Sequence, residues 1–223
     1  MANNRRAVTS GSAAASEGKP ENRKFRLILE TARRLFLHQG FDASSMDLVA
    51  RAAGVSKATL YVHFENKEAL LLALVEDECR RLAPPSRLWE PEPGPLDVKR
   101  TLLAIARKFT SHFLDNRGLA FHRLMTAEAS RFPKISRAFY EAVPVRLYAE
   151  VAAFLAAAVA EGRLVIPDIQ LAVTQFLSLV RGDLMLYWSL GVRQVSKQEY
   201  DALIESGVAV FLAAYGRRPG RDD

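Results

Sequence analysis

The chain has 223 residues, of which 49% are hydrophobic and 25% charged, a composition that excludes a disordered protein and allows one or two folded domains. Its net charge of +6 is concentrated in residues 1–67, which hold 11 Lys and Arg against 6 Asp and Glu, and such a basic segment favours a nucleic-acid partner. The single cysteine, Cys79, excludes an internal disulfide and a cysteine-based zinc finger.

Residues 1–20 are rich in Ser, Ala, Gly and Asn and show no apolar periodicity, which predicts a disordered tail. They also lack the apolar stretch of a secretory signal, so we expect a cytoplasmic protein. Apolar residues then recur at helical spacing from Phe25 to Phe36, and Gly40 is expected to end this first helix.

Two short helices are expected next. Ser44, with Asp47 three residues later, predicts a capping box for a helix that runs to about Ala53. Gly54 ends it, and Ser56 caps a second helix that runs to about His63. Two short helices joined by a tight turn have the geometry of a helix-turn-helix, although helical hairpins without a DNA function also fit this pattern.

The second short helix has a polar outer face. We expect that face to hold Lys57, Ala58, Thr59, Tyr61 and His63, which suit phosphates and base edges. The inward-facing residues of the pair are expected to be apolar: Met46, Leu48, Val49, Ala52, Val55 and Leu60.

A longer helix, opened by Asn66, is expected from Lys67 to about Leu82, followed by a linker from Pro84 to Pro95 that holds five prolines. Five further helical segments follow, and Pro144 is expected to kink the third of them. Their expected bounds are 96–114, 118–129, 133–160, 168–190 and 196–215. The richest apolar run, Val143 to Ala160, is interrupted by Pro144, Arg146 and Glu150, so we expect no membrane span.

Three strings sharpen the interpretation: FDASSMDLVA at 41–50, AGVSKATLYVHF at 53–64 and NKEAL at 66–70. Over about residues 22–71 they resemble the DNA-binding domain of the tetracycline-repressor (TetR) family. The resemblance implies that Lys57, Ala58 and Thr59 face base edges. It also implies phosphate contacts from a second set, with Ser56 among the DNA-binding residues: Ser44, Ser45, Tyr61, His63 and Lys67. Residues 121–133 and 175–183 are similar to AefR-like members of the same family.

The expected architecture is therefore all-α, with about nine helices. A tail at 1–20 precedes a three-helix DNA-binding domain at 21–67, and a ligand-binding and dimerisation domain at 68–215 precedes a tail at 216–223. Family resemblance favours an apolar pocket for a small-molecule effector, although these aromatic residues also fit an ordinary core. The expected pocket residues are Phe109, Phe113, Phe121, His122, Met125, Phe154 and Phe176.

The last two segments, 168–190 and 196–215, are expected to form a four-helix bundle with their copies in a homodimer. Their predicted interface residues are Val180, Leu184, Trp188, Leu203, Gly207, Val208 and Phe211. Such a dimer would place two recognition helices on a palindromic operator in double-stranded DNA.

No catalytic motif is present, so we expect no enzyme activity and no cofactor. The four histidines show no metal-ligand spacing, so no metal site is expected either. The favoured function is a ligand-released repressor. The alternatives are a ligand-independent regulator or an activator of the same fold, a helical enzyme, and a helical interaction module.

Overall fold

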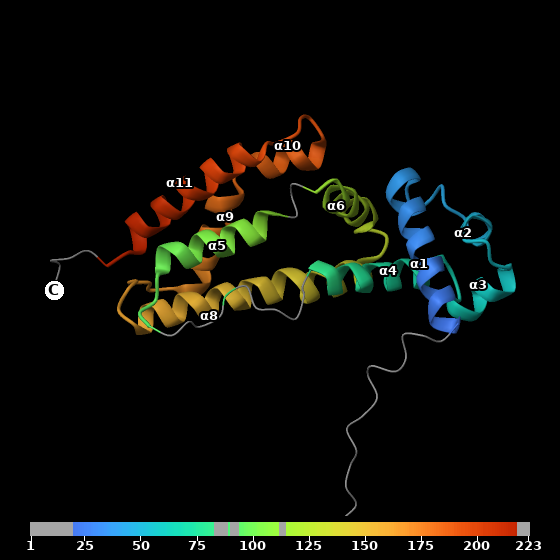
Figure 1. The fold of residues 1–223 in the computed structure, drawn as a ribbon, viewed down its shortest axis with the longest axis horizontal. Coiled ribbons are helices and arrows are strands. Elements are labelled where there is room, and N and C mark those ends of the chain that lie inside the picture. Colours follow the sequence, from blue (N-terminus) through green and yellow to red (C-terminus); the bar gives the residue numbers. More distant parts are fainter. Residues whose placement is uncertain (1–19, 83–88, 90–93, 112–114, 218–223) are drawn as a thin grey trace, which may run out of the picture. The chain divides into compact units, whose positions relative to one another are not determined.

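The computed structural model describes residues 20–82, 89, 94–111 and 115–217, with side chains from residue 23 onward. Within these residues the regular elements are helices, apart from one isolated antiparallel bridge between Leu164 and Gly216 (Figure 1), which confirms the expected all-α fold. The chain divides into two compact units, which we call unit 1 (to Leu74) and unit 2 (from Val75). The expected N-terminal tail, residues 1–20, lies outside the described residues except for Pro20, where α1 begins.

Unit 1 consists of α1 (Pro20–Gln39), α2 (Met46–Ala52), α3 (Lys57–His63) and the first half of α4 (Lys67–Leu82). The residues after α1 and α2 are Gly40 and Gly54, whose φ angles of 86° and 65° place the backbone where a Cβ is unfavourable. The buried apolar residues of all four helices form the core of this unit: Ile28, Leu29, Ala32, Phe36, Val49, Ala50, Leu60, Leu70, Leu71 and Leu74.

The helix caps of unit 1 agree with the sequence at two positions out of three. Ser56 caps α3, since its Oγ accepts from Thr59 N at 3.1 Å, and Asn66 Oδ1 accepts from Ala69 N at 2.8 Å at the start of α4. The capping box expected at Ser44 is wrong. Ser45 caps α2 instead, by accepting from Leu48 N at 3.1 Å, and the buried Ser44 hydroxyl donates to Gly40 O at 2.9 Å.

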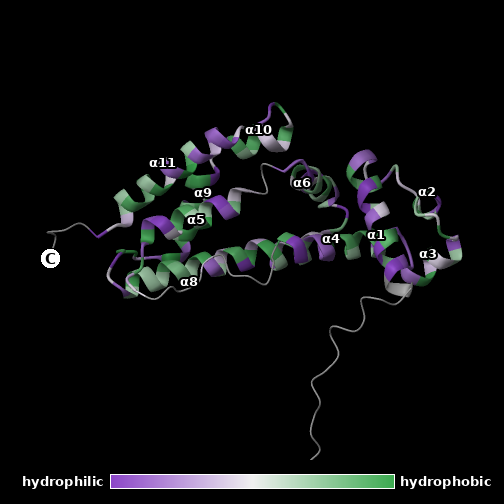
Figure 2. Cartoon of the chain, viewed as in Figure 1, coloured by the Kyte–Doolittle hydropathy of each residue, from purple (hydrophilic) through white to green (hydrophobic). Residues whose placement is uncertain are grey.

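Unit 2 holds the second half of α4 and the remaining helices. These are α5 (Val98–Thr110), α6 (Asn116–Glu128), α7 (Pro133–Tyr140), a π-helical turn (Glu141–Val145), α8 (Arg146–Ala160), α9 (Ile169–Arg181), α10 (Leu184–Leu190) and α11 (Lys197–Tyr215). Figure 2 shows hydrophobic residues along most of α8. The core is built mainly from α5, α8, α9 and α11, and its buried members are Leu102, Ile105, Ala106, Val151, Phe154, Leu155, Ala158, Ala172, Val173, Phe176, Leu177, Val180, Ile204, Val208 and Phe211.

Two of the nine expected helices are divided. The segment 133–160 contains a π-helical turn around Pro144, because proline cannot donate the backbone hydrogen bond of a regular helix. The segment 168–190 breaks at Gly182, whose φ of 50° ends α9. A Cβ at Gly182 would also lie 2.9 Å from Leu203 Cδ2, so this break is fixed by packing as well as by backbone conformation.

Helices α9 and α11 approach each other closely at Gly207. A Cβ on this residue would lie 3.0 Å from both the carbonyl carbon and the oxygen of Leu179 on α9. The close approach expected of Gly207 between two protomers is therefore made within one protomer.

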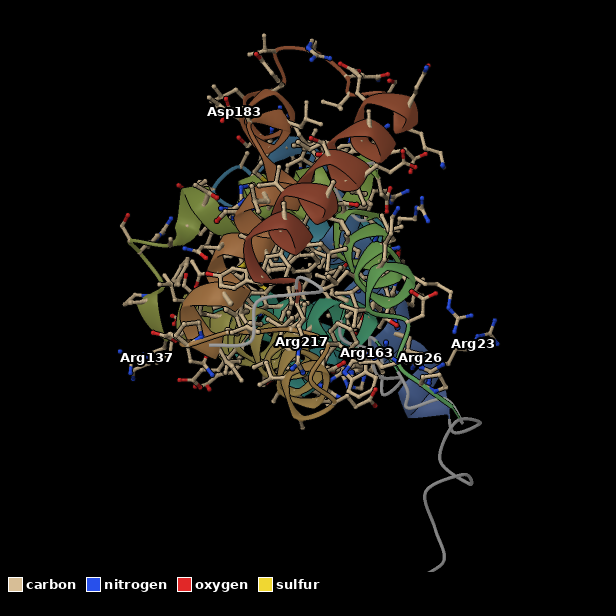
Figure 3. The ribbon with its side chains drawn as sticks, turned by 90° about the vertical axis from the view of Figure 1, so that its left-hand side faces the viewer. Arg23, Arg26, Arg137, Arg163, Asp183 and Arg217 are labelled. Carbon is tan, nitrogen blue, oxygen red and sulfur yellow. The ribbon has the colours of Figure 1, made fainter. Side chains whose placement is uncertain are left out.

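The loop after α8 is fastened to the end of α11 by backbone hydrogen bonds. Val165 N donates to Tyr215 O at 2.8 Å, and Arg217 N donates to Arg163 O at 3.2 Å. Figure 3 looks onto this end of unit 2, with Arg163 and Arg217 labelled. These bonds fix where α11 ends relative to α8 and α9.

The segment Pro133–Ala160 is the one described helical stretch that is long and apolar enough to cross a membrane by length and composition. A membrane is not needed to explain its apolar residues. Val151, Phe154, Leu155 and Ala158 of this segment are fully buried in the core of unit 2.

The thiol of Cys79, on the second half of α4, is expected to be almost unreactive in the folded protein. Burial, with smaller contributions from Glu76 and Glu78, raises its pKa to about 11, so the nucleophilic thiolate is rare. At pH 8 we expect a disulfide reagent such as DTNB to label the native protein at least ~100-fold more slowly than the protein in urea. Cys79→Ser should abolish labelling, and fast labelling of the native protein would contradict this burial.

Candidate nucleic-acid interface and cavity

The helix-turn-helix of unit 1 is held by buried residues on both of its helices. Val49 of α2 and Leu60 of α3 are fully buried, and Val55 N donates to Ala50 O at 3.0 Å across the turn. Because these contacts anchor the inner faces, the outer face of α3 is presented in a fixed orientation.

The exposed face of α3 consists of Lys57, Ala58, Tyr61 and Val62. Tyr61 is 49% exposed and Val62 is 75% exposed, a large value for an apolar side chain. Sequence reasoning included the first three and missed Val62. Its position one turn after Ala58 places it on the same face, which is the signal that would have found it.

Three further predicted residues lie at the starts of the two helices. Ser45 and Ser56 are exposed, and each caps its own helix. Thr59 is half-buried, and its hydroxyl lies 2.8 Å from the hydroxyl of Ser56. Thr59 therefore presents less surface to DNA than was expected of a residue that reads bases.

Lys57 forms an ion pair with Asp47 of α2, and both side chains are more than half exposed. An exposed pair of this kind contributes at most about 1 kcal/mol, since water and salt screen it. Exchanging the Asp47 carboxylate for a DNA phosphate therefore costs little, and Lys57 stays available for binding.

Three predicted phosphate contacts are engaged inside unit 1. Ser44 is fully buried, which contradicts its expected contact with DNA. His63 is half-buried, with its ring edge-on to Phe25 at 6.1 Å. The Lys67 Nζ donates to Phe41 O at 2.8 Å and lies 4.1 Å from the centre of the Phe41 ring, so this ammonium group stabilises the start of α4.

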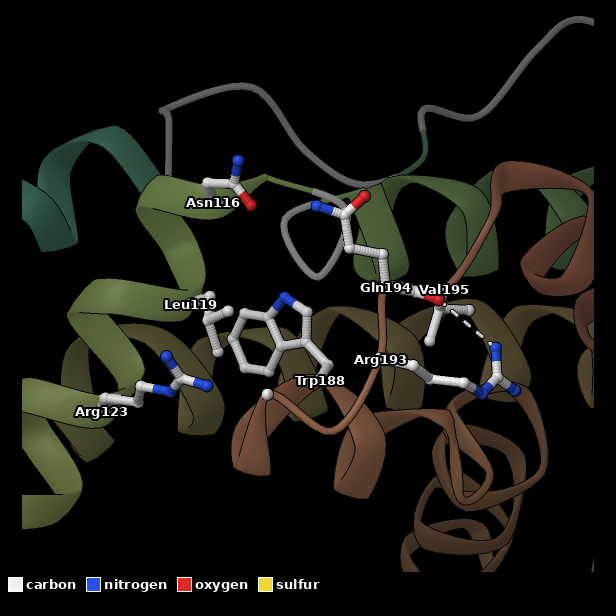
Figure 4. Close-up of a pocket in the computed structure, with 8 residues that line it drawn as sticks. Asn116, Leu119, Arg123, Trp188, Arg193, Gln194 and Val195 are labelled. Carbon is white, nitrogen blue, oxygen red and sulfur yellow. Dashed lines mark hydrogen bonds between the residues drawn. The ribbon is translucent and has the colours of Figure 1, made fainter.

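Unit 2 contains a cavity of about 550 Å³ between α6 and the connection from α10 to α11. Figure 4 shows its lining, which combines apolar and polar side chains: Asn116, Leu119, Arg123, Trp188, Gly191, Arg193, Gln194 and Val195. The wall is stiffened from behind, because Trp188 packs on the buried Tyr200. Burial raises the pKa of the Tyr200 phenol to about 12, so this group is neutral.

None of the described residues predicted for the ligand pocket lines this cavity. Phe154 and Phe176 are fully buried in the core, where no space for a ligand surrounds them, which contradicts their expected role. Phe121 and Met125 are also buried, Phe109 is partly buried between the two apolar clusters, and Phe113 lies outside the described residues. His122 comes nearest, since its ring packs on Trp188 at 5.2 Å.

The predicted dimer residues face the interior of their own protomer. Val180, Trp188, Gly207, Val208 and Phe211 are all buried in the single chain, which contradicts their assignment to a surface between protomers. Leu184 and Leu203 are half-buried. The exposed face of α11 instead carries small residues at helical spacing, and these are Ala202, Ser206, Ala209 and Ala213, with Val210 beside them.

A fixed helix-turn-helix with an exposed recognition face, followed by a separate helical unit, defines a helix-turn-helix transcriptional regulator. Residues 28–74 match the family described as bacterial regulatory proteins of the tetR type. Residues 100–217 match the AefR-like transcriptional repressor C-terminal domain. The chain belongs to the TetR family of transcriptional regulators, as the sequence strings predicted.

Solved structures of this family resemble most of the chain. The flavonoid-responsive regulator FrrA is 39% identical, with a TM-score of 0.73 over 88% of this chain and 98% of its own. A TetR-family regulator from Mesorhizobium loti is 27% identical, with a TM-score of 0.75 over 89% of this chain and 100% of its own.

Curated relatives match a shorter part. The regulator UidR from Escherichia coli K12 is 41% identical over 68 residues, which make up 30% of this chain and 33% of UidR. The curated relatives compared here are matched over about a fifth to a third of their own length.

Proposed function

We propose that the protein is a cytoplasmic homodimeric repressor that binds a palindromic operator and is released from it by a small aromatic or apolar molecule. The observation that carries the proposal is the exposed face of α3, formed by Lys57, Ala58, Tyr61 and Val62 on an anchored helix-turn-helix. The match of unit 2 to a repressor C-terminal domain supports the sign of regulation. An activator or a ligand-independent regulator of the same fold is the alternative.

The residues of α3 divide into two roles. Lys57 and Tyr61 carry polar groups at the ends of long side chains, which suit phosphates and base edges in the major groove. Ala58 and Val62 offer apolar surface, which suits the methyl group of thymine. We therefore expect an operator half-site that contains A·T pairs where these two residues lie.

The dimer is proposed to form through the outer faces of α9 and α11. Small side chains at Ala202, Ser206, Ala209 and Ala213 allow the backbone of a second copy to approach closely, and the buried Phe211 holds the same helix in its own protomer. A two-fold dimer places its recognition helices about 34–36 Å apart, the distance between successive major grooves on one side of DNA.

Helix α4 is the proposed connection between effector and DNA. Its first half contributes Leu70, Leu71 and Leu74 to the core of unit 1. Its second half carries the buried Glu78, which pairs with Arg117 of α6 at 3.3 Å within unit 2. A ligand that shifts α6 would move α4 through this pair, since separating a buried ion pair is costly. An effector of aromatic character is supported by the flavonoid-responsive relative FrrA.

Operator binding tests the proposal. DNA fragments selected with the purified protein would supply the operator, and fluorescence anisotropy across a salt series would measure affinity. Tyr61→Ala is expected to weaken binding about tenfold by removing one phosphate or base contact, and Lys57→Ala to reduce the salt slope by about one. Tyr140→Ala, which removes a tyrosine that is 60% exposed in unit 2, is the matched control and should bind normally. Wild-type binding by Tyr61→Ala, Lys57→Ala and Thr59→Ala alike would refute the assignment.

A further inference from the structure

The cavity of unit 2 has the dimensions and walls of a small-molecule site. Its volume of about 550 Å³ lies within the range of known ligand pockets, roughly 300–1,000 Å³. Leu119, Trp188 and Val195 supply apolar surface, and the indole offers a flat face for a ring. Asn116 and Gln194 add amide groups at the rim. A planar, largely apolar molecule with one or two polar groups would match this lining.

Arg123 gives the cavity its charge. Its Nε donates to Ser189 O at 3.0 Å, which fixes the guanidinium against the end of α10. The contact is close, because a Cβ on the adjacent Gly191 would lie 2.1 Å from one terminal nitrogen of Arg123. In the described part of the chain neither terminal nitrogen has an acidic partner, and Figure 4 shows the guanidinium turned toward Trp188. Two parallel N–H groups therefore remain for a ligand.

The second arginine of the lining is already neutralised. Arg193 pairs with Glu199 at 2.8 Å and stacks on the Tyr187 ring at 4.6 Å, and in Figure 4 it points away from the indole. The lining contains no aspartate or glutamate. The positive field of Arg123 acts on its neighbour His122, whose pKa is lowered first by burial and then by this charge. The cavity thus holds one uncompensated positive charge at a fixed position.

We propose that this cavity binds a planar aromatic acid, whose ring lies against Trp188 and whose carboxylate forms a two-pronged pair with the terminal nitrogens of Arg123. A carboxylate matches the spacing of two parallel guanidinium N–H groups, whereas an uncharged amide of the same shape does not. The inference rests on the proposed function only in giving this molecule the role of effector.

The test uses aromatic acids and their amides as matched probes: benzoate, cinnamate and 2-naphthoate, each beside the corresponding carboxamide. Binding is followed by quenching of Trp188 fluorescence in a Trp89→Phe background, since these are the two tryptophans of the chain. We expect at least one acid to bind about 10–100-fold more tightly than its amide. Arg123→Gln should remove that preference, and Arg123→Lys should retain part of it.

Arg193→Gln is the control, because it removes the second arginine of the lining and should leave the preference for the acid unchanged. Thermal unfolding and operator binding without probe should be normal in Arg123→Gln, which separates a lost ligand contact from misfolding. If no acid is preferred over its amide, or if Arg123→Gln keeps the preference, the inference is overturned. If the acid binds through Arg123 but leaves the operator complex intact, the site stands and the effector role in the proposed function fails.

Discussion

Replacing Phe176 with alanine is expected to lower the free energy of unfolding by about 3–5 kcal/mol. Phe176 of α9 is fully buried and lies edge-on to Phe211 of α11, with ring centres 5.4 Å apart and planes at 67°. Removing the ring opens a void that close-packed neighbours on α8 and α11 can fill only in part. The expected loss shifts the folding equilibrium by a factor of roughly 10² to 10³.

Urea unfolding followed by tryptophan fluorescence measures this effect at a fixed protein concentration, because both tryptophans belong to unit 2. Tyr140→Ala is again the control, since truncating an exposed ring should change stability by less than about 0.5 kcal/mol. A loss below about 1 kcal/mol for Phe176→Ala would mean that the residue borders open space. That result would restore its sequence-based assignment to a ligand pocket.

Replacing Ala209 with arginine is expected to convert the proposed dimer into monomers and to weaken operator binding about 10³-fold. Ala209 lies in the middle of the exposed stripe of small residues on α11, so an arginine there separates the two backbones and places charge in the seam. A monomer carries one recognition helix and loses the phosphate contacts of the second half-site. Sedimentation gives the assembly state, and anisotropy with the selected operator gives the affinity.

Two comparison variants sharpen this test. Ala153→Arg places the same charge on an exposed alanine of α8 and should leave the dimer intact. Phe211→Glu should unfold unit 2 rather than yield folded monomers, since it buries a carboxylate without a partner. Dissociation by Ala153→Arg but not by Ala209→Arg would move the interface to α8.

The DNA-binding unit was the part most predictable from sequence, because its determinants are local. Gly40, Gly54 and Ser56 mark helix ends through their own backbone or side-chain requirements, and the structure uses them so. The error at Ser44 is a shift of one residue. Adjacent serines offer the same hydroxyl, and the burial of Phe41 just before them decides which one points inward.

The dimer and pocket residues were harder to predict, because an apolar stripe does not say which neighbour it faces. Val208 and Phe211 form the most apolar face of α11, and that face is consumed by the core of unit 2. The cavity depends on Arg123, which meets the residues after α10 only in the folded chain. Such contacts between distant segments leave no periodic signal in the sequence.

The contact at Gly207 has a consequence for how this chain can change over generations. Every single-base change in a glycine codon that alters the amino acid either adds a Cβ or ends translation. At Gly207 that atom would strike the main chain of Leu179, which no second substitution can reshape. The residues around Arg123 are side chains on a rim and are free of this constraint. Mutation can therefore retune what the cavity accepts while the spacing of α9 and α11 stays inherited unchanged.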